Sequence, residues 1–145
     1  MPAGPPTAEP IGLQLSRTAK LLSRAFDDAL AAEGASLPVW LVLVSVKGRR
    51  HAMQRDLADS LGIEGATLTH HLGKMEAAGL VTRRRDPGDR RNQLVELTAD
   101  GDAMFARLVA TVAAFDKRLR RGLSATELAG LEATLTRLRE NVGAS

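Results

Sequence analysis

The stretch Met53–Thr98 constrains the fold of this chain most, because two short helix patterns are followed there by a basic hairpin pattern. Apolar residues recur at helical spacing over Gln54–Leu61, and Gly62 ends that pattern. A second helical pattern covers Glu64–Ala78. Two helices joined by so tight a glycine turn predict a helix-turn-helix.

The hairpin pattern consists of two strand-like runs, Leu80–Arg85 and Asn92–Leu97. They are separated by Asp86–Asp89, in which Pro87 and Gly88 occupy favourable turn positions. The sequence therefore predicts a mainly α fold with a small β-wing, a winged helix-turn-helix head over residues 36–98. This order of elements is typical of proteins that bind double-stranded DNA.

Helical patterns flank the head on both sides. Residues 1–10 hold four of the six prolines and predict a flexible tail, and residues 11–34 predict one long amphipathic helix. Leu37–Val46, with Ser36 as the expected N-cap, is apolar almost throughout, which predicts a buried helix.

After the wing, a helix is expected from Thr98 or Asp100 to Gly122, and Ser124–Glu127 predicts a capping box that opens a last helix. The apolar residues of that helix alternate spacings of three and four, as in a heptad seam. The stripes of residues 11–34 and 99–143 cannot all be buried on a small winged head. We therefore expect one domain over residues 11–145 and a two-fold homodimer built from N- and C-terminal dimerisation helices.

Composition excludes several classes of site and protein. The chain has no cysteine, which excludes disulfides, thiolate metal sites and cysteine-based redox sensing. No apolar run approaches the roughly 18 residues that span a bilayer, and the N-terminus lacks a basic segment followed by an apolar one. We expect a cytoplasmic protein with no membrane partner.

Charge is unevenly distributed along the chain. Residues 47–92 hold ten Lys or Arg against six Asp or Glu, a net charge of +4, whereas the rest of the chain carries −1. A basic head between nearly neutral helices fits a polyanionic partner. A merely solvated basic face is the alternative.

Five motifs occur in a fixed order: Gln54–Ala58, Thr67–Thr69, Met75–Val81, Asp89–Arg91 and Val95–Thr98. Together they resemble the multiple antibiotic resistance regulator (MarR) family. The resemblance implies a ligand-responsive transcriptional regulator, by family habit a repressor, that releases DNA when a small aromatic or acidic effector binds. Recognition helices related by a two-fold axis enter successive major grooves about 34 Å apart, which predicts a pseudo-palindromic operator.

The resemblance assigns DNA contact to Thr67 and Thr69, with ordinary helix-surface hydroxyls as the alternative. His70 stands where relatives often carry arginine, and Gly65 where they often carry a long polar residue. Lys74, four residues beyond His70, is expected to reach a phosphate or to be solvated.

In the wing, Arg83 and Arg85 are expected on one strand face and Arg84 on the other, with at least one face on the DNA backbone. The resemblance implies that Asp89 holds an arginine while Arg91 enters the minor groove. Arg90 is an alternative for that insertion. The alternative to any DNA contact by the wing is a charged loop that is simply solvated. Gln54 and Arg55 open a helix whose N-terminus is suited to phosphate, so we expect them to position the DNA.

An effector pocket is implied at the junction of the dimer helices and the head. Trp40 is the only tryptophan and is suited to stack on a planar ligand, with Arg17, Lys20 or Arg24 offering a cation to a carboxylate. The alternative is that Trp40 belongs to the core and the cations are solvated.

Three histidines, at positions 51, 70 and 71, raise a metal hypothesis. Adjacent helical residues point about 100° apart and no cysteine completes a soft site, so we predict no metal site. His71 stands where relatives usually place an apolar side chain, and a buried imidazole there would make DNA affinity depend on pH. A metal- or pH-responsive regulator is kept as an alternative.

No glycine-rich phosphate loop, nucleophile elbow or clustered His/Asp/Glu set occurs outside the head. We therefore expect neither an enzyme nor a cofactor. A dimeric winged-helix scaffold that binds protein instead of DNA is the other alternative.

Overall fold

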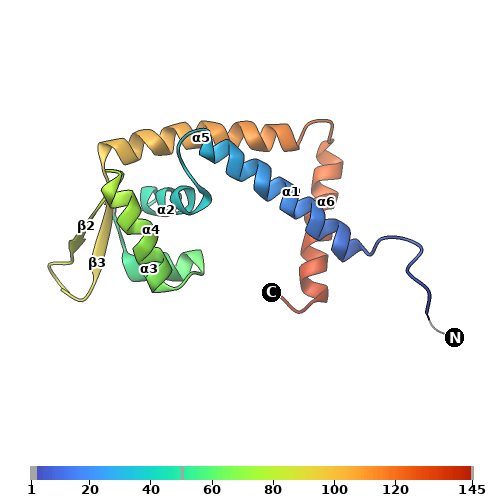
Figure 1. Ribbon diagram of the computed structural model, residues 1–145, viewed down its shortest axis with the longest axis horizontal. Coiled ribbons are helices and arrows are strands. Elements are labelled where there is room, and N and C mark those ends of the chain that lie inside the picture. The colour runs from blue at the N-terminus through green and yellow to red at the C-terminus, as the bar shows by residue number, and fades with distance from the viewer. Residues whose placement is uncertain (1–2, 50, 145) are drawn as a thin grey trace. The chain divides into compact units, whose positions relative to one another are not determined.

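A computed structural model describes residues 3–49 and 51–144. In these residues the chain forms helices and strands in the following order (Figure 1): α1 (Ile11–Ala31), α2 (Leu37–Lys47), β1 (His51–Met53), α3 (Gln54–Leu61), α4 (Gly65–Ala77), β2 (Val81–Arg85), β3 (Gln93–Leu97), α5 (Ala99–Leu119) and α6 (Ala125–Asn141). The chain divides into two compact units, residues 1–111 and 112–145, with the boundary inside α5. A single domain over residues 11–145 stays a prediction.

The first unit contains the helix-turn-helix that the sequence predicts. Helix α3 ends at Gly62, whose φ of +65° lies in the left-handed region that glycine adopts at little cost. Leu57 from α3 and Leu68 and Leu72 from α4 are fully buried. These leucines recur at the helical spacing seen in the sequence, and they fix α4 on the core with its outer face exposed.

The wing is part of a three-stranded antiparallel sheet with strand order β1-β3-β2. Strand β3 is central, so that Val95 lies opposite Ala52 on one side and Arg83 on the other. Figure 1 shows the β2–β3 hairpin projecting beyond α3 and α4. The sequence predicted the hairpin but not β1, because three residues are too few to show an alternating pattern.

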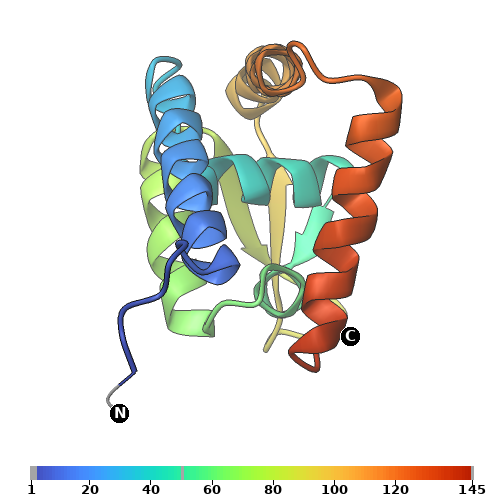
Figure 2. The ribbon, with the colours of Figure 1, turned by 90° about the vertical axis from the view of Figure 1, so that its right-hand side faces the viewer.

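Helix α2 lies across the sheet (Figure 2) and begins at Ser36, whose hydroxyl accepts a hydrogen bond from the Val39 amide as predicted. Its expected complete burial is wrong for the single chain. The buried face consists of Val42, Leu43 and Val46, while the other face of α2 stays exposed. A helix on one side of a sheet can bury only the stripe that faces the sheet, even when all its residues are apolar.

The return from β3 to α5 is tightly built. The Thr98 hydroxyl donates to the Gly79 carbonyl (2.5 Å) and accepts from the Gly101 amide (3.0 Å), and the Thr98 amide donates to the Leu80 carbonyl (3.1 Å). Gly101 is required here, because a Cβ at this position would lie 2.1 Å from the Leu80 carbonyl oxygen. These contacts fasten α5 to the start of the wing.

Helix α6 opens with the predicted capping box: the Ser124 hydroxyl accepts from the Glu127 amide, and the Glu127 carboxylate accepts from the Ser124 amide. None of its residues from 125 to 141 is buried in the single chain. Among the described helices, none is long and apolar enough to span a membrane.

Candidate nucleic-acid interface

A groove of about 630 Å³ separates the helix-turn-helix from the wing. Helices α3 and α4 and the segment between them form one wall, and residues of the wing, from the middle of β2 and from the turn into β3, form the other. The lining residues are Gln54, Arg55, Ala58, Asp59, Ile63, Glu64, Gly65, Thr69, Arg83, Arg91, Asn92 and Gln93. The groove thus brings together five of the residues that the sequence nominated for DNA contact: Gln54, Arg55, Thr69, Arg83 and Arg91.

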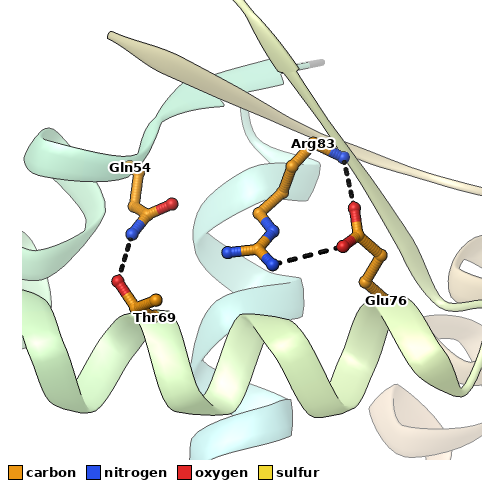
Figure 3. Close-up of polar contacts among 4 residues, drawn as sticks. All are labelled: Gln54, Thr69, Glu76 and Arg83. Atoms are coloured by element: carbon orange, nitrogen blue, oxygen red, sulfur yellow. Dashed lines mark hydrogen bonds and ion pairs between the residues drawn. The ribbon is translucent and has the colours of Figure 1, made fainter. Parts of the chain in front are cut away.

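Gln54 links the start of α3 to the middle of α4. Its side-chain amide donates a 2.7 Å hydrogen bond to the Thr69 hydroxyl (Figure 3). That hydroxyl itself donates to the Gly65 carbonyl at 2.9 Å. The single hydroxyl hydrogen of Thr69 is therefore used inside α4. Toward an outside partner Thr69 keeps its methyl group and an acceptor lone pair.

Arg83 is held by Glu76 at the end of α4. The Glu76 Oε1 atom lies 3.2 Å from the Arg83 Nη2 atom, and the Glu76 Oε2 atom accepts from the Arg83 backbone amide, also at 3.2 Å (Figure 3). The side-chain hydrogen bond from Arg83 is the largest cause that holds the pKa of Glu76 below its ordinary value, against a smaller opposing effect of desolvation. The sequence analysis did not propose Glu76 as a functional residue. Its position shortly before the basic strand β2 could have identified it, because an acidic residue there can pair with an arginine of the strand.

The other two strand arginines have different surroundings. Arg84 donates through Nε and Nη2 to the Glu96 Oε1 atom, at 3.0 and 2.8 Å, from the neighbouring strand. Arg85 is exposed and has no ion pair among residues 3–49 and 51–144. Alternation along β2 thus directs Arg83 and Arg84 to different partners, as the strand period predicts.

The wing turn is organised by two aspartates. Asp86 accepts a hydrogen bond from the Gly88 amide at 3.0 Å, and Asp89 accepts from the Arg91 amide at 3.1 Å. The expectation that Asp89 holds an arginine side chain is not met: in the described part of the chain its partners are this amide and the Asn92 side chain, 3.4 Å away. An aspartate two residues before an amide closes a local turn, and that local bond competes with a longer-range ion pair.

The outer face of α4 carries an exposed stripe. Thr67, His70 and Lys74 follow the i, i+3, i+7 spacing of one helix face, and all three are exposed. Within the described residues, Thr67 and Lys74 have no side-chain hydrogen bond or ion pair. This stripe differs from the side of α4 that carries Thr69 into the groove, so α4 presents two surfaces to a partner.

A scan against family models matches residues 36–92 to the MarR family. These residues form a MarR family domain. They comprise α2, the helix-turn-helix and the wing as far as Asn92.

Individual relatives agree with this assignment. Over 89 residues, which are 61% of this chain and 54% of the relative, the chain is 36% identical to YdgJ of Bacillus subtilis, an uncharacterized HTH-type transcriptional regulator. The match thus spans about half the length of that curated relative.

Two solved structures cover most of this chain. A MarR mutant from E. coli, complexed with operator DNA, is 25% identical with a TM-score of 0.78, covering 89% of this chain and 93% of that one. The repressor CouR of Rhodococcus jostii RHA1, bound to a 23-mer duplex, is 27% identical with a TM-score of 0.80, covering 89% and 92%. CouR has also been solved with p-coumaroyl-CoA.

The candidate effector residues have separate contacts in the part of the chain that the structure describes. Trp40 stacks on Phe105 of α5, with ring centroids 5.9 Å apart, and Lys47 lies over the same Phe105 ring and 2.7 Å from Asp102. Arg17 pairs with Glu9 at 2.8 Å. Lys20 and Arg24 line a shallow hollow formed by α1 alone, to which Trp40 does not contribute.

The histidines give no metal centre in the part of the chain that the structure describes. No group of three His, Cys, Asp or Glu side chains there could hold an ion. The rings of His70 and His71 lie 5.9 Å apart and tilted, and His71 is half-buried, so the premise of a buried imidazole is wrong. The side chain of His51 lies outside the described residues.

Proposed function

We propose that this protein is a ligand-responsive transcriptional regulator, a repressor, that binds a pseudo-palindromic DNA operator as a homodimer. The observation that carries the proposal is the groove between helix-turn-helix and wing, where Arg55 and Arg91 face the same space as Gln54 and Thr69. Arginine side chains on both walls suit a phosphate backbone, while the exposed stripe of α4 is available for base edges.

The relatives support this role. Both E. coli MarR and CouR have been solved with DNA duplexes at 25% and 27% identity to this chain. The relatives are regulators, and we propose that this chain likewise has no enzymatic activity and needs no cofactor. Its working compartment is then the cytoplasm, where the operator lies.

Exposed apolar side chains support the homodimer. In the single chain Ile11 of α1 is 65% exposed and Leu131 of α6 is 48% exposed, and Leu15, Leu22 and Val142 are also exposed. Apolar surface on both terminal helices suits burial against a second copy. A dimer supplies two recognition helices, as a two-fold symmetric operator requires.

The effector part of the proposal rests on a relative and on candidate residues of this chain. CouR has been solved with p-coumaroyl-CoA, an aromatic ligand with acidic groups. In this chain Trp40 is the aromatic candidate, Arg17, Lys20 and Arg24 are the cationic candidates, and His71 is a further candidate. We propose a small aromatic or acidic effector near Trp40.

The test is fluorescence anisotropy with duplex from upstream of the protein's own gene and with unrelated duplex, at two salt concentrations. Arg91→Ala should weaken operator binding about tenfold and reduce the salt slope by about one. Arg121→Ala, which removes an exposed arginine outside the head, is the matched control and should leave both unchanged.

Two other outcomes have distinct meanings. Equal weak binding to both duplexes that ignores Arg91→Ala, repeated with duplexes selected from genomic fragments, would contradict operator binding. Weak binding with almost no salt dependence would favour the alternative of a winged-helix scaffold for a protein partner.

A further inference from the structure

We propose that Glu76 is a positioning residue that holds the wing on the recognition helix α4 through Arg83, and that Arg83 acts on DNA through wing geometry instead of by contacting a phosphate. This inference rests on the proposed DNA-binding function and deepens it. The inference changes the role of Arg83, which the sequence analysis proposed as a DNA contact. It also adds Glu76, which the sequence analysis did not propose as a site residue.

Glu76 contacts Arg83 through both of its carboxylate oxygens. One carboxylate oxygen of Glu76 accepts from the Arg83 guanidinium and the other accepts from the Arg83 backbone amide, both at 3.2 Å (Figure 3). The first bond orients the side chain, and the second fastens the backbone of β2 itself. Glu76 therefore fixes the position of the β2 backbone relative to α4. An ion pair between the ends of the two side chains would not hold the backbone in this way.

Arg83 is also packed in place. Its side chain is 19% exposed, compared with 53% for Arg84, its neighbour in the strand. The guanidinium lies over Gly73, one turn before Glu76: a Cβ at Gly73 would be 4.0 Å from the Arg83 Nη2 atom. This distance is that of an ordinary van der Waals contact, so Arg83 lies close to α4 without crowding it.

The pair is placed where it can set the width of the groove. Arg83 lies opposite Val95 in the hairpin that carries Arg91 at its tip, and Val95 is fully buried. Arg83 and Arg91 line one wall of the groove, and Arg55 and Thr69 line the other. A shift of β2 along α4 would therefore move Arg91 relative to the helix-turn-helix.

The two possible roles of Arg83 predict opposite effects of removing the charge of Glu76. If Arg83 contacts a phosphate, Glu76→Gln releases the guanidinium and removes a negative charge, so binding tightens and the salt slope steepens. If Glu76 positions the wing, Glu76→Gln loosens the hairpin and weakens specific binding. The salt slope then stays the same, because the number of neutralised phosphates is unchanged.

The experiment compares Glu76→Gln, Arg83→Gln and the double variant in the full-length protein by anisotropy over a salt series. We expect about tenfold weaker operator binding in each single variant, no further loss in the double variant, and an unchanged salt slope in all three. Asp28→Asn is the control: it removes one negative charge from an exposed position of α1 that does not line the groove and has no side-chain hydrogen bond or ion pair among the described residues, so affinity should stay the same.

Arg83→Lys covers the case in which a glutamine variant folds poorly. Lysine keeps the charge and binds phosphate well, but it lacks the planar fork of arginine. We expect this variant to lose specific affinity while keeping its affinity for unrelated duplex. Wild-type affinity in Arg83→Lys, or a salt slope lower by about one in Arg83→Gln, would overturn the inference in favour of a phosphate contact.

Failure of the inference and failure of the proposed function give different results. Wild-type protein that selects no duplex would overturn both. Selective wild-type binding combined with tighter binding by Glu76→Gln would overturn only the positioning role.

Discussion

Three consecutive arginines in β2 have acquired three different surroundings. Arg83 is tied to α4 by Glu76, Arg84 is tied to β3 by Glu96, and Arg85 is exposed without an ion pair in the described chain. The residue type is the same, so the difference comes from strand alternation and from the acidic residues that each face meets. Their electrostatic effects on a DNA partner should differ accordingly.

The pKa of Glu76 predicts a pH-dependent contribution to stability. Because the folded state holds this pKa below its ordinary value of 4.5, the ionised carboxylate stabilises the fold above that value, and the contribution is lost as pH falls through the lowered folded value. The midpoint of thermal unfolding should therefore be higher for wild type than for Glu76→Gln at neutral pH. The gap should close under acidic conditions.

Circular dichroism melts across a pH series measure this gap. A difference between wild type and Glu76→Gln that stays constant down to the lowest pH at which both fold would contradict the assignment.

At the scale of elements, the junction between the wing and α5 depends on close backbone approach. Thr98 donates to the carbonyls of Gly79 and Leu80, which precede β2, and accepts from the amide of Gly101 in the first turn of α5. The start of α5 therefore lies against Leu80, directly before β2, and only a residue without a side chain fits at position 101. Thr98 thus both caps α5 and holds the start of that helix against the segment before β2.

Gly101→Ala should therefore destabilise the protein. The new Cβ would lie 2.1 Å from the Leu80 carbonyl oxygen, so the helix or the strand must move, at a cost of roughly 1–3 kcal/mol or more. Chemical denaturation measures the loss. Gly73→Ala is the matched control within the same unit: its Cβ makes only an ordinary contact at 4.0 Å, and alanine favours a helix by about 0.5–1 kcal/mol. Equal stability of the two variants would contradict the clash.

At the scale of the whole molecule, the terminal helices leave apolar surface that one chain does not cover. Leu131 of α6 is 48% exposed and belongs to the heptad seam of that helix, whereas Ala133 lies about 200° away on the opposite face. Leu131→Asp places a charge in the proposed dimer interface, and Ala133→Asp places the same charge outside it.

We expect Leu131→Asp to shift the molar mass in size-exclusion chromatography with light scattering from dimer toward monomer. It should also weaken operator binding roughly a hundredfold, because one head then binds one half-site without its tethered partner. Ala133→Asp should remain dimeric and bind as wild type. A wild-type protein that is monomeric at all concentrations would contradict the dimer itself.

The local features of this fold were readable in the sequence. The end of α3 at Gly62, the Ser36 cap, the Ser124–Glu127 capping box and the wing turn each depend on residues within about four positions of one another. Apolar periodicity likewise identified the helices, because a helix that must bury one face repeats that requirement every turn. The assignment to a winged helix-turn-helix follows from the order of these local signals.

Only the tertiary structure decided which distant residues meet. It added β1 to the sheet, paired Arg83 with Glu76, replaced the expected arginine partner of Asp89 by a backbone amide, and stacked Trp40 on Phe105, 65 positions along the chain. Helix and turn signals are short-range, since they reflect backbone bonds between near neighbours. Partners such as these depend on which faces approach when the elements pack, and that is a property of the packed molecule as a whole.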